Sequence, residues 1–321
     1  DGQQPRQPAA DSVIAEIVAL RRMGLRFIAL ADDNFYPVSL SDIALAEKRG
    51  DAARAAQLRR LREERFKLLE RLSELPHDMV FFTQITMEAA EDPAFLAAMA
   101  KARIKGALVG VEAVTPEGLK AVFKEFNLSG EGLAARLRLF RENGVHLVGS
   151  FIFGLPSDRP DTFQATAELA KKANLTLAQF VMLTPLPGTV DFERWKKKVG
   201  NGVARVNGVP ITRYWLIPGH LRPKVYIPHP NMSAEEIRAR TQQVWDDYYR
   251  LGEIWKRIRG VGRRRDRLIL LFMSKLYHQM YANTGIATDS ARRNKANRWA
   301  RWIAVIARKL FQAKPMPELQ M

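Results

Sequence analysis

The chain has 321 residues, of which 47% are hydrophobic, and a formal net charge of +17. It contains no cysteine, which excludes disulfides, zinc–thiolate sites and thiolate-bound iron–sulfur clusters built from this chain alone. No apolar run reaches the roughly 18 to 20 residues that a membrane-spanning helix requires. The length suits one large domain, or a domain with an extension.

Positive charge is concentrated toward the C-terminal end. Residues 233–321 carry 19 Lys and Arg against 8 Asp and Glu, which amounts to +11 of the net +17. A basic region of this kind attracts nucleic acid, anionic lipid or an acidic partner, and charge alone does not choose among them.

The first predicted strand is followed by a polar triplet. Residues 1–10 are rich in Gly, Pro and Gln and predict an open end, and an amphipathic helix is expected over 13–22. A short apolar strand over 27–31 then runs into Asp32, Asp33 and Asn34. A polar turn that caps the next helix explains these side chains as simply as a ligand site does.

A long charged segment precedes the next two strands. Residues 39–75 carry Arg, Glu, Leu and Ala at helical spacing, which predicts a helical hairpin broken near Gly50. We expect both helices to lie solvated on the outside of the domain and to carry no chemistry. Strands are then expected over 79–86 and 106–111, and Glu112 follows the second of them.

The stretch His146–Asp158 contains the most apolar predicted strand. Its β-branched and aromatic residues predict a strand with both faces buried, which is typical of parallel sheets. The strand ends at Gly154, and an amphipathic helix over 160–173 follows. An ordinary core strand with a turn is the alternative to a ligand-binding loop here. One more strand is expected over 178–183, before a proline-rich loop.

Strands thus alternate with helices five times, which predicts right-handed βαβ units and a parallel sheet or barrel. The loops after the strands of such a barrel open on one face. We therefore expect a shared ligand site on that face, formed by Asp32, Asp33, Asn34, Gln84, Glu112, Ser150 and Thr184.

Beyond residue 190 the pattern changes. Residues 193–232 lose periodicity and contain many Gly and Pro, which predicts an ordered loop or linker over the open face. A helix is expected over 233–259 and an apolar helix over 268–281. A last helix, over 290–311, has Trp and Ile on one face and Arg and Lys elsewhere. It suits contact with an anionic membrane, or packing on its own domain with a solvated basic face.

As a set, the strand ends resemble those of radical S-adenosylmethionine (SAM) enzymes, in particular those with an N-terminal cobalamin-binding domain. The resemblance covers about residues 10–195. It rests on five segments in this order: 31–35 (ADDNF), 82–86 (FTQIT), 110–116 (GVEAVTP), 149–156 (GSFIFGLP) and 183–189 (LTPLPGT).

The resemblance implies an α/β fold, a partial (β/α)6 TIM-like barrel whose first strand is missing here, with a basic α-helical C-terminal extension. In this class a Cys-x3-Cys-x2-Cys loop after the first strand holds a [4Fe–4S] cluster, and SAM binds its unique iron. An electron donor supplies the reduction that cleaves SAM to a 5′-deoxyadenosyl radical. The cofactors implied are SAM, the [4Fe–4S] cluster and, through an N-terminal domain, cobalamin.

By the same resemblance, Asp32, Asp33 and Asn34 stand where the class contacts the SAM amino group. Gln84, from the second segment, is a further cofactor-binding candidate. Carboxylate and amide oxygens suit a cationic ligand that carries an amino group.

The remaining candidates follow the later strands. Glu112 and Ser150 stand near the SAM ribose and carboxylate, whereas Gly154 and the run from Thr184 through Pro185 to residue 187 stand near its adenine. An adenine that approaches the backbone closely favours glycine and apolar walls. No residue of the chain is a candidate metal ligand.

The absence of the three cluster cysteines is the one departure from the class. We expect the chain to begin after the first strand and cluster loop, and to lack an upstream cobalamin domain. On its own, such a chain neither binds the cluster nor makes the radical.

The expected function is that of a radical SAM enzyme portion. The full-length protein is expected to methylate or rearrange a hydrophobic, lipid-like small molecule, in the cytoplasm or at the inner face of the membrane. The alternative is a non-catalytic barrel remnant whose basic helices bind anionic membrane or an acidic partner. Nucleic-acid binding is disfavoured because no such motif is visible, and Schiff-base chemistry because no lysine follows the strands.

The expected division of the chain has three parts. Residues 1–195 form the barrel, residues 196–232 a linker or covering loop, and residues 233–321 a basic helical region.

Overall fold

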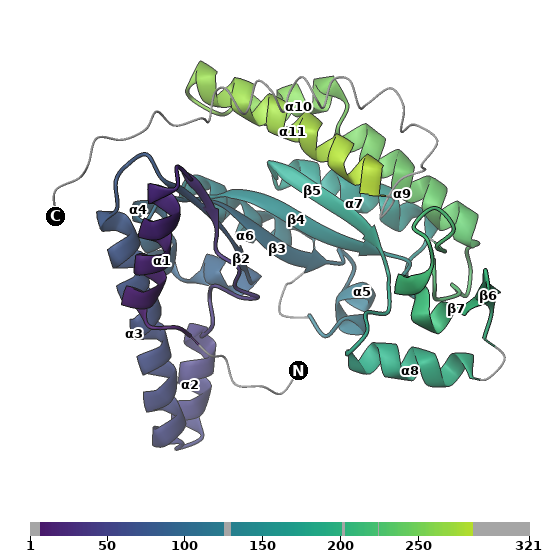
Figure 1. Cartoon of the computed structure of the whole chain (residues 1–321), viewed down its shortest axis with the longest axis horizontal. Helices are drawn as coiled ribbons and strands as arrows, with labels where there is room; N and C mark the ends of the chain where they lie inside the picture. Colours follow the sequence, from purple (N-terminus) through teal and green to yellow (C-terminus); the bar gives the residue numbers. More distant parts are fainter. Residues whose placement is uncertain (1–6, 125–129, 201–202, 224, 285–321) are drawn as a thin grey trace. The chain divides into compact units, whose positions relative to one another are not determined.

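The computed structural model describes residues 7–124, 130–200, 203–223 and 225–284 (Figure 1). Five strands of one sheet lie beside one another in chain order. They are β1 (Phe27–Ala29), β2 (Val80–Ile85), β3 (Ile104–Glu112), β4 (His146–Phe153) and β5 (Leu177–Met182). A doubly wound sheet reverses its order part-way, whereas a (β/α) barrel does not. The predicted α/β class, with a parallel sheet in the strand order of a partial barrel, is confirmed.

The first three strands pair in parallel. Phe27 of β1 lies opposite Val80 of β2, and Phe82 of β2 lies opposite Gly106 of β3. A Cβ at residue 106 would lie 2.8 Å from the Phe82 ring, so any residue other than glycine there would force this ring to shift.

The described residues form two compact units. The N-terminal unit contains the residues up to 110 together with 131–149, and the C-terminal unit contains 111–130 and the residues from 150 onward. Strands β3 and β4 contribute residues to both units. The predicted division at residues 195 and 232 stays a prediction.

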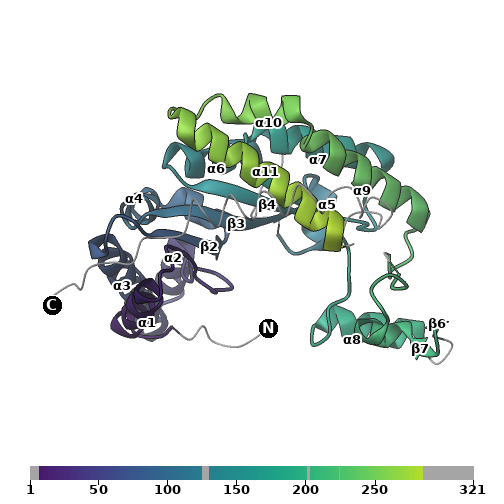
Figure 2. The same ribbon diagram turned by 45° about the horizontal axis from the view of Figure 1, so that its top comes forward.

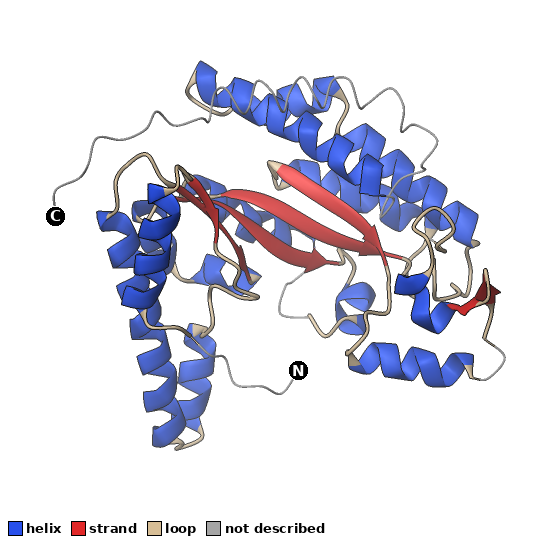
Figure 3. Ribbon diagram, in the orientation of Figure 1, coloured by secondary structure: helices blue, strands red, loops and turns tan. Residues whose placement is uncertain are grey.

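Helices separate the strands of the N-terminal unit (Figure 3). They are α1 (Ala10–Arg22), α2 (Leu40–Lys48), α3 (Ala52–Glu74), the 3-10 helix η1 (Met87–Glu91), α4 (Pro93–Lys101) and α6 (Gly130–Glu142). The predicted hairpin is confirmed: Gly50 has φ +72° between α2 and α3, and the Asp51 side chain accepts from the Arg54 N–H at 2.9 Å. A glycine at positive φ followed by an Asp cap ends one helix and begins the next.

The C-terminal unit contains more structure than its sequence predicts. Its elements are α5 (Pro116–Ala121), α7 (Pro160–Lys172), α8 (Val190–Val199), β6 (Arg205–Val206), β7 (Val209–Pro210), η3 (Ile211–Leu216), α9 (Ala234–Tyr248), α10 (Leu251–Ile258) and α11 (Arg264–Thr284). Part of the expected loop 193–232 is therefore folded. Phe192, Trp195, Tyr214, Ile217 and Tyr226 bury one another in a small cluster, because aromatic area stabilises even a segment without periodicity.

Helix α9 packs against β5 through an aromatic core. Trp245, Tyr248 and Tyr249 are fully buried, and the rings of Trp245 and Tyr248 contact Phe180 of β5 edge-on. The Tyr249 hydroxyl donates to the Ala178 carbonyl at 2.7 Å and accepts from the Ala178 N–H at 2.9 Å. These bonds satisfy backbone groups of β5, which is an edge strand of the sheet in the described residues.

One helix expected over 233–259 is in fact two. The chain leaves α9 at Tyr249, and Arg250 is extended (φ −61°, ψ 138°) before α10 begins. The side-chain bonds of Tyr249 hold the end of α9 on β5, while α10 turns away to lie beside α11 (Figure 2). The basic helix expected over 290–311 lies outside the described residues.

Candidate functional site

The nine predicted site residues lie within or directly after the carboxyl-terminal halves of consecutive strands. They fall into two groups, one in each unit. The N-terminal unit holds Asp32, Asp33, Asn34 and Gln84. The C-terminal unit holds Glu112, Ser150, Gly154, Thr184 and Pro185.

Asp32 is held by an arginine that the sequence did not single out. The Arg65 Nη1 of α3 donates to the Asp32 carboxylate at 2.7 Å, and the Arg65 side chain is only 3% exposed. Its guanidinium also lies 4.2 Å from the centre of the Phe35 ring. The expectation that α3 is a solvated helix is wrong at this position, because the Arg65 side chain is buried. Arg65 fixes the Asp32 carboxylate and neutralises its charge.

Asn34 holds the loop after β1 against the end of β2. Its side-chain oxygen accepts from the backbone N–H groups of Tyr36 at 3.0 Å and Thr86 at 3.3 Å. The Phe35 N–H donates to the Gln84 carbonyl at 2.8 Å. Asn34 is therefore a structural clamp, and its amide oxygen is already used.

Asp33 and Gln84 present their side chains to solvent. Both are exposed, whereas Phe35, Thr83 and Ile85 beside them are buried. In the described part of the chain the Asp33 carboxylate has no ion-pair partner. Within this group it is the acceptor best able to meet a cationic ligand.

Glu112 adopts a backbone conformation that few side chains tolerate. Its φ is +69°, and the Ala113 N–H donates to the Val111 carbonyl at 2.9 Å, which closes a three-residue turn around Glu112. Its carboxylate accepts from Lys124 Nζ at 2.9 Å and is 17% exposed. Turns of this hand are rare and strained, and such residues cluster at functional sites.

Ser150 is joined to a side chain of β5. The Gln179 Nε2 donates to the Ser150 Oγ at 2.8 Å. Ser150 is 8% exposed, so its hydroxyl lies in a mostly dry environment. A buried hydroxyl that already accepts one bond keeps one proton to donate.

Gly154 begins a loop that a buried carboxylate organises. Gly154 has φ +92°, and its N–H and that of Leu155 donate to one oxygen of Asp158 at 2.8 and 3.0 Å. Burial raises the pKa of Asp158 to about 6, against the effect of these two bonds and of nearby His229. A Cβ at Gly154 would meet nothing closer than 3.8 Å. The backbone conformation therefore explains this glycine without a ligand.

His229 fastens a distant segment to the same loop. Its Nδ1 accepts from the N–H groups of Asn231 and Met232 at 3.1 Å, so its Nε2 carries the proton. The Nε2 lies 2.9 Å from the Leu155 carbonyl and donates to it. Neither Asp158 nor His229 was predicted as a site residue. Asp158 follows the apolar strand within the stretch that the sequence marks, whereas no local pattern marks His229.

The loop after β5 is held by side-chain hydroxyls that donate to its backbone carbonyls. The Thr184 hydroxyl donates to the Met182 carbonyl at 3.0 Å, and the Pro185 carbonyl accepts from the Tyr214 hydroxyl at 3.1 Å. Ala113, Leu119 and Leu155 form an apolar cluster, with Ile152 and Leu183 packed against it. Ala113, which follows Glu112 directly in the chain, is thus part of a buried apolar cluster.

The donors and acceptors of the C-terminal group fit part of a SAM molecule. Glu112 and Ser150 offer a carboxylate and a hydroxyl, which are acceptor and donor groups that suit the ribose and the amino-acid end of SAM. A [4Fe–4S] cluster does not fit: the chain has no cysteine, and no group of three His, Asp or Glu side chains in the described segments could hold a metal.

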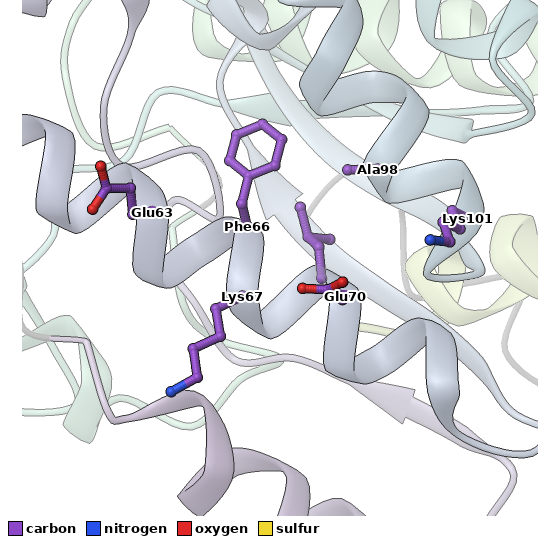
Figure 4. Close-up of a pocket in the computed structure, with 7 residues that line it drawn as sticks. Glu63, Phe66, Lys67, Glu70, Ala98 and Lys101 are labelled. Carbon is purple, nitrogen blue, oxygen red and sulfur yellow. The ribbon is translucent and has the colours of Figure 1, made fainter.

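Figure 4 shows a depression on the helical side of the N-terminal unit, between α3 and α4. It is lined by Glu63, Phe66, Lys67, Leu69, Glu70, Ala98 and Lys101. None of the predicted site residues lines it, and it is not part of the candidate site.

No helix within the described ranges is long and apolar enough to cross a membrane.

Curated relatives of the chain include methyltransferases, although no family model matches it. A hopanoid C-2 methylase of Rhodopseudomonas palustris is 25% identical over 202 residues, which cover 61% of this chain and 34% of the methylase. An uncharacterized methyltransferase of Pyrococcus horikoshii is 25% identical over 140 residues, 44% of this chain and 28% of that protein. The chain thus spans about a third of the length of these relatives.

Solved structures share the fold. TsrM of Kitasatospora setae, a radical SAM methyltransferase solved with cobalamin and a [4Fe–4S] cluster, matches 93% of this chain and 57% of TsrM with a TM-score of 0.50 and 18% identity. A second TsrM structure, with tryptophan and the SAM analogue aza-SAM, matches 74% of this chain and 46% of TsrM with a TM-score of 0.50 and 19% identity. The resemblance of the strand ends to cobalamin-type radical SAM enzymes is confirmed at the level of the fold.

Proposed function

We propose that this chain, which has the fold of the cobalamin-type radical SAM methyltransferases, forms the SAM-binding part of a methyltransferase that acts on a small molecule. The observation that carries the proposal is the sheet itself: five strands in barrel order, with the predicted site residues in or after their carboxyl-terminal halves. The methyltransferases among its relatives support the same reaction class.

The proposal assigns the ribose, the carboxylate and the adenine of SAM to residues of the C-terminal unit. That Asp33, exposed and without an ion-pair partner in the described residues, contacts the amino group stays a sequence-based prediction. Glu112 and Ser150 contact the ribose and the carboxylate, while Gly154, Thr184 and Pro185 border the adenine. In this arrangement Asp32 and Asn34 shape the loop that presents Asp33, because Arg65 and two backbone N–H groups already occupy their oxygens. Gln84 is an exposed donor on the neighbouring strand.

When bound, SAM supplies the methyl group or, after reductive cleavage, the 5′-deoxyadenosyl radical. The residues of this chain bind and orient SAM and limit the access of water to it. Thiolate ligands for a [4Fe–4S] cluster must then come from residues outside this sequence, since it has no cysteine.

The proposed substrate is a hydrophobic small molecule. One relative is named for a hopanoid, and TsrM was solved with tryptophan. These names support a small-molecule substrate for the chain, and the hopanoid favours a lipid-like one.

The test uses the protein that contains this chain, loaded with iron, sulfide and cobalamin and supplied with SAM and a strong reductant. The expected result is SAM consumption that yields S-adenosylhomocysteine or 5′-deoxyadenosine. Glu112→Gln, which removes the charge and keeps the shape, should slow it by about tenfold. A loaded protein that consumes no SAM would contradict the proposal and leave the non-catalytic remnant as the better description.

A further inference from the structure

A chain of hydrogen bonds connects helix α11 to the predicted SAM contact Ser150. The Tyr277 hydroxyl of α11 donates to the Gln179 Oε1 at 2.9 Å, and the Gln179 Nε2 donates to the Ser150 Oγ at 2.8 Å. All three residues belong to the C-terminal unit. Tyr277 lies 98 positions after Gln179, in a helix for which the sequence predicted no part in the site.

The direction of these bonds decides what Ser150 offers to a ligand. Because Tyr277 donates to the amide oxygen of Gln179, the amide nitrogen faces Ser150. The Ser150 oxygen therefore accepts, and its own proton is left to donate. Within the described residues, the Ser150 hydroxyl makes this one hydrogen bond and donates none of its own.

The chain of hydrogen bonds from Tyr277 through Gln179 to Ser150 is called the relay below. Packing fixes the position of the Tyr277 hydroxyl, where the relay begins. The Tyr277 ring lies against Trp245 and Tyr249 of the α9 segment, with ring centres 6.2 and 6.3 Å apart. Lys275, two residues earlier on α11, donates to the Tyr249 carbonyl at 2.8 Å. Tyr277 is partly buried, and its contact with these two buried rings restricts the position of its hydroxyl, which favours one orientation of the Gln179 amide.

We propose that Gln179 and Tyr277 are positioning residues that make Ser150 a hydrogen-bond donor, so that the ligand group meeting Ser150 is an oxygen acceptor such as a carboxylate. This inference rests on the proposed function. It also gives α11 a part in ligand binding, since the orientation of the Gln179 amide on β5 depends on Tyr277 of α11.

The test is a titration of the 321-residue chain with S-adenosylhomocysteine, followed by calorimetry. Ser150→Ala should raise Kd about five- to tenfold, which is the effect of one lost hydrogen bond. Tyr277→Phe should raise Kd about threefold and should have no further effect in the Ser150→Ala background, because the relay acts only through Ser150.

The matched control is Tyr248→Phe. It removes a 2.7 Å hydrogen bond to the Leu175 carbonyl from the same aromatic cluster, without touching the relay. Its Kd should equal that of the wild type even where its melting temperature falls as far as that of Tyr277→Phe.

The outcomes separate the two claims. If the wild-type chain does not bind S-adenosylhomocysteine, the proposed function and this inference are both wrong. If it binds, and Tyr277→Phe leaves Kd unchanged or adds its full effect to that of Ser150→Ala, only the inference is wrong.

Discussion

Glu112 combines a strained backbone with a charged side chain at the end of β3. With φ at +69°, any residue other than glycine loses about 1–2 kcal/mol there. Two variants isolate this cost, because Glu112→Gly and Glu112→Ala both remove the carboxylate that pairs with Lys124. We predict that the glycine variant is more stable than the alanine variant by about 1 kcal/mol in urea unfolding. Equal stability, or a more stable alanine variant, would show that the backbone there is relaxed.

Asp158 makes stability depend on pH in the direction opposite to most carboxylates. Burial raises its folded pKa to about 6, above its ordinary value of 3.8, so the folded state favours the protonated form. The stabilising contribution is therefore complete below about pH 4 and is lost as the pH rises through 6.

Asp158→Asn tests this directly. The variant keeps an oxygen for the N–H groups of Gly154 and Leu155 and cannot ionise. Relative to the variant, the wild type should lose about 2–3 kcal/mol of unfolding free energy between pH 4 and pH 7.5. Urea unfolding at several pH values measures the difference. If the difference in unfolding free energy between wild type and variant stayed constant with pH, or changed in the opposite direction, the two hydrogen bonds would outweigh the effect of burial on the pKa of Asp158.

Helix α3 contributes a buried cation to the loop after β1, although it is one of the most charged elements of the chain. Arg65→Met leaves Asp32 without its partner and removes the stacking on Phe35. We predict a loss of about 2–4 kcal/mol in unfolding free energy. The control is Arg59→Met on the same helix, whose pair with Glu47 is exposed and should contribute less than about 1 kcal/mol. Similar losses in the two variants would contradict a special role for Arg65.

The strands and the hairpin were predictable because their signals are local. Apolar runs mark β2 to β5, and Gly50 with Asp51 marks the break between α2 and α3. The break between α9 and α10 has no glycine or proline at Tyr249 or Arg250, and it depends on tertiary bonds to β5. Local patterns carry no such information.

The site was predictable only in part. Strand ends make Glu112 and Ser150 candidates, because parallel strands in barrel order bring their carboxyl ends to one side. The positive φ of Glu112 leaves no mark in the sequence, since glycine is the residue that usually signals it. Arg65, Gln179 and Tyr277 escape notice because their partners are tens of residues away.

At the scale of the whole molecule, the proposed SAM contacts stand in a chain that has no cysteine to hold an iron–sulfur cluster. Reconstitution of this chain with iron and sulfide should give no stable [4Fe–4S] absorbance, because it contains no thiolate. A cluster that survives desalting would contradict this prediction and would require ligands other than cysteine.

The central claim is that the strand ends of this chain bind SAM. Calorimetric titration of the chain with SAM measures it most directly. We predict saturable binding of one SAM per chain, weakened at least about tenfold when Glu112→Gln and Ser150→Ala are combined. Absence of binding, or equally tight binding by the double variant, would contradict this claim.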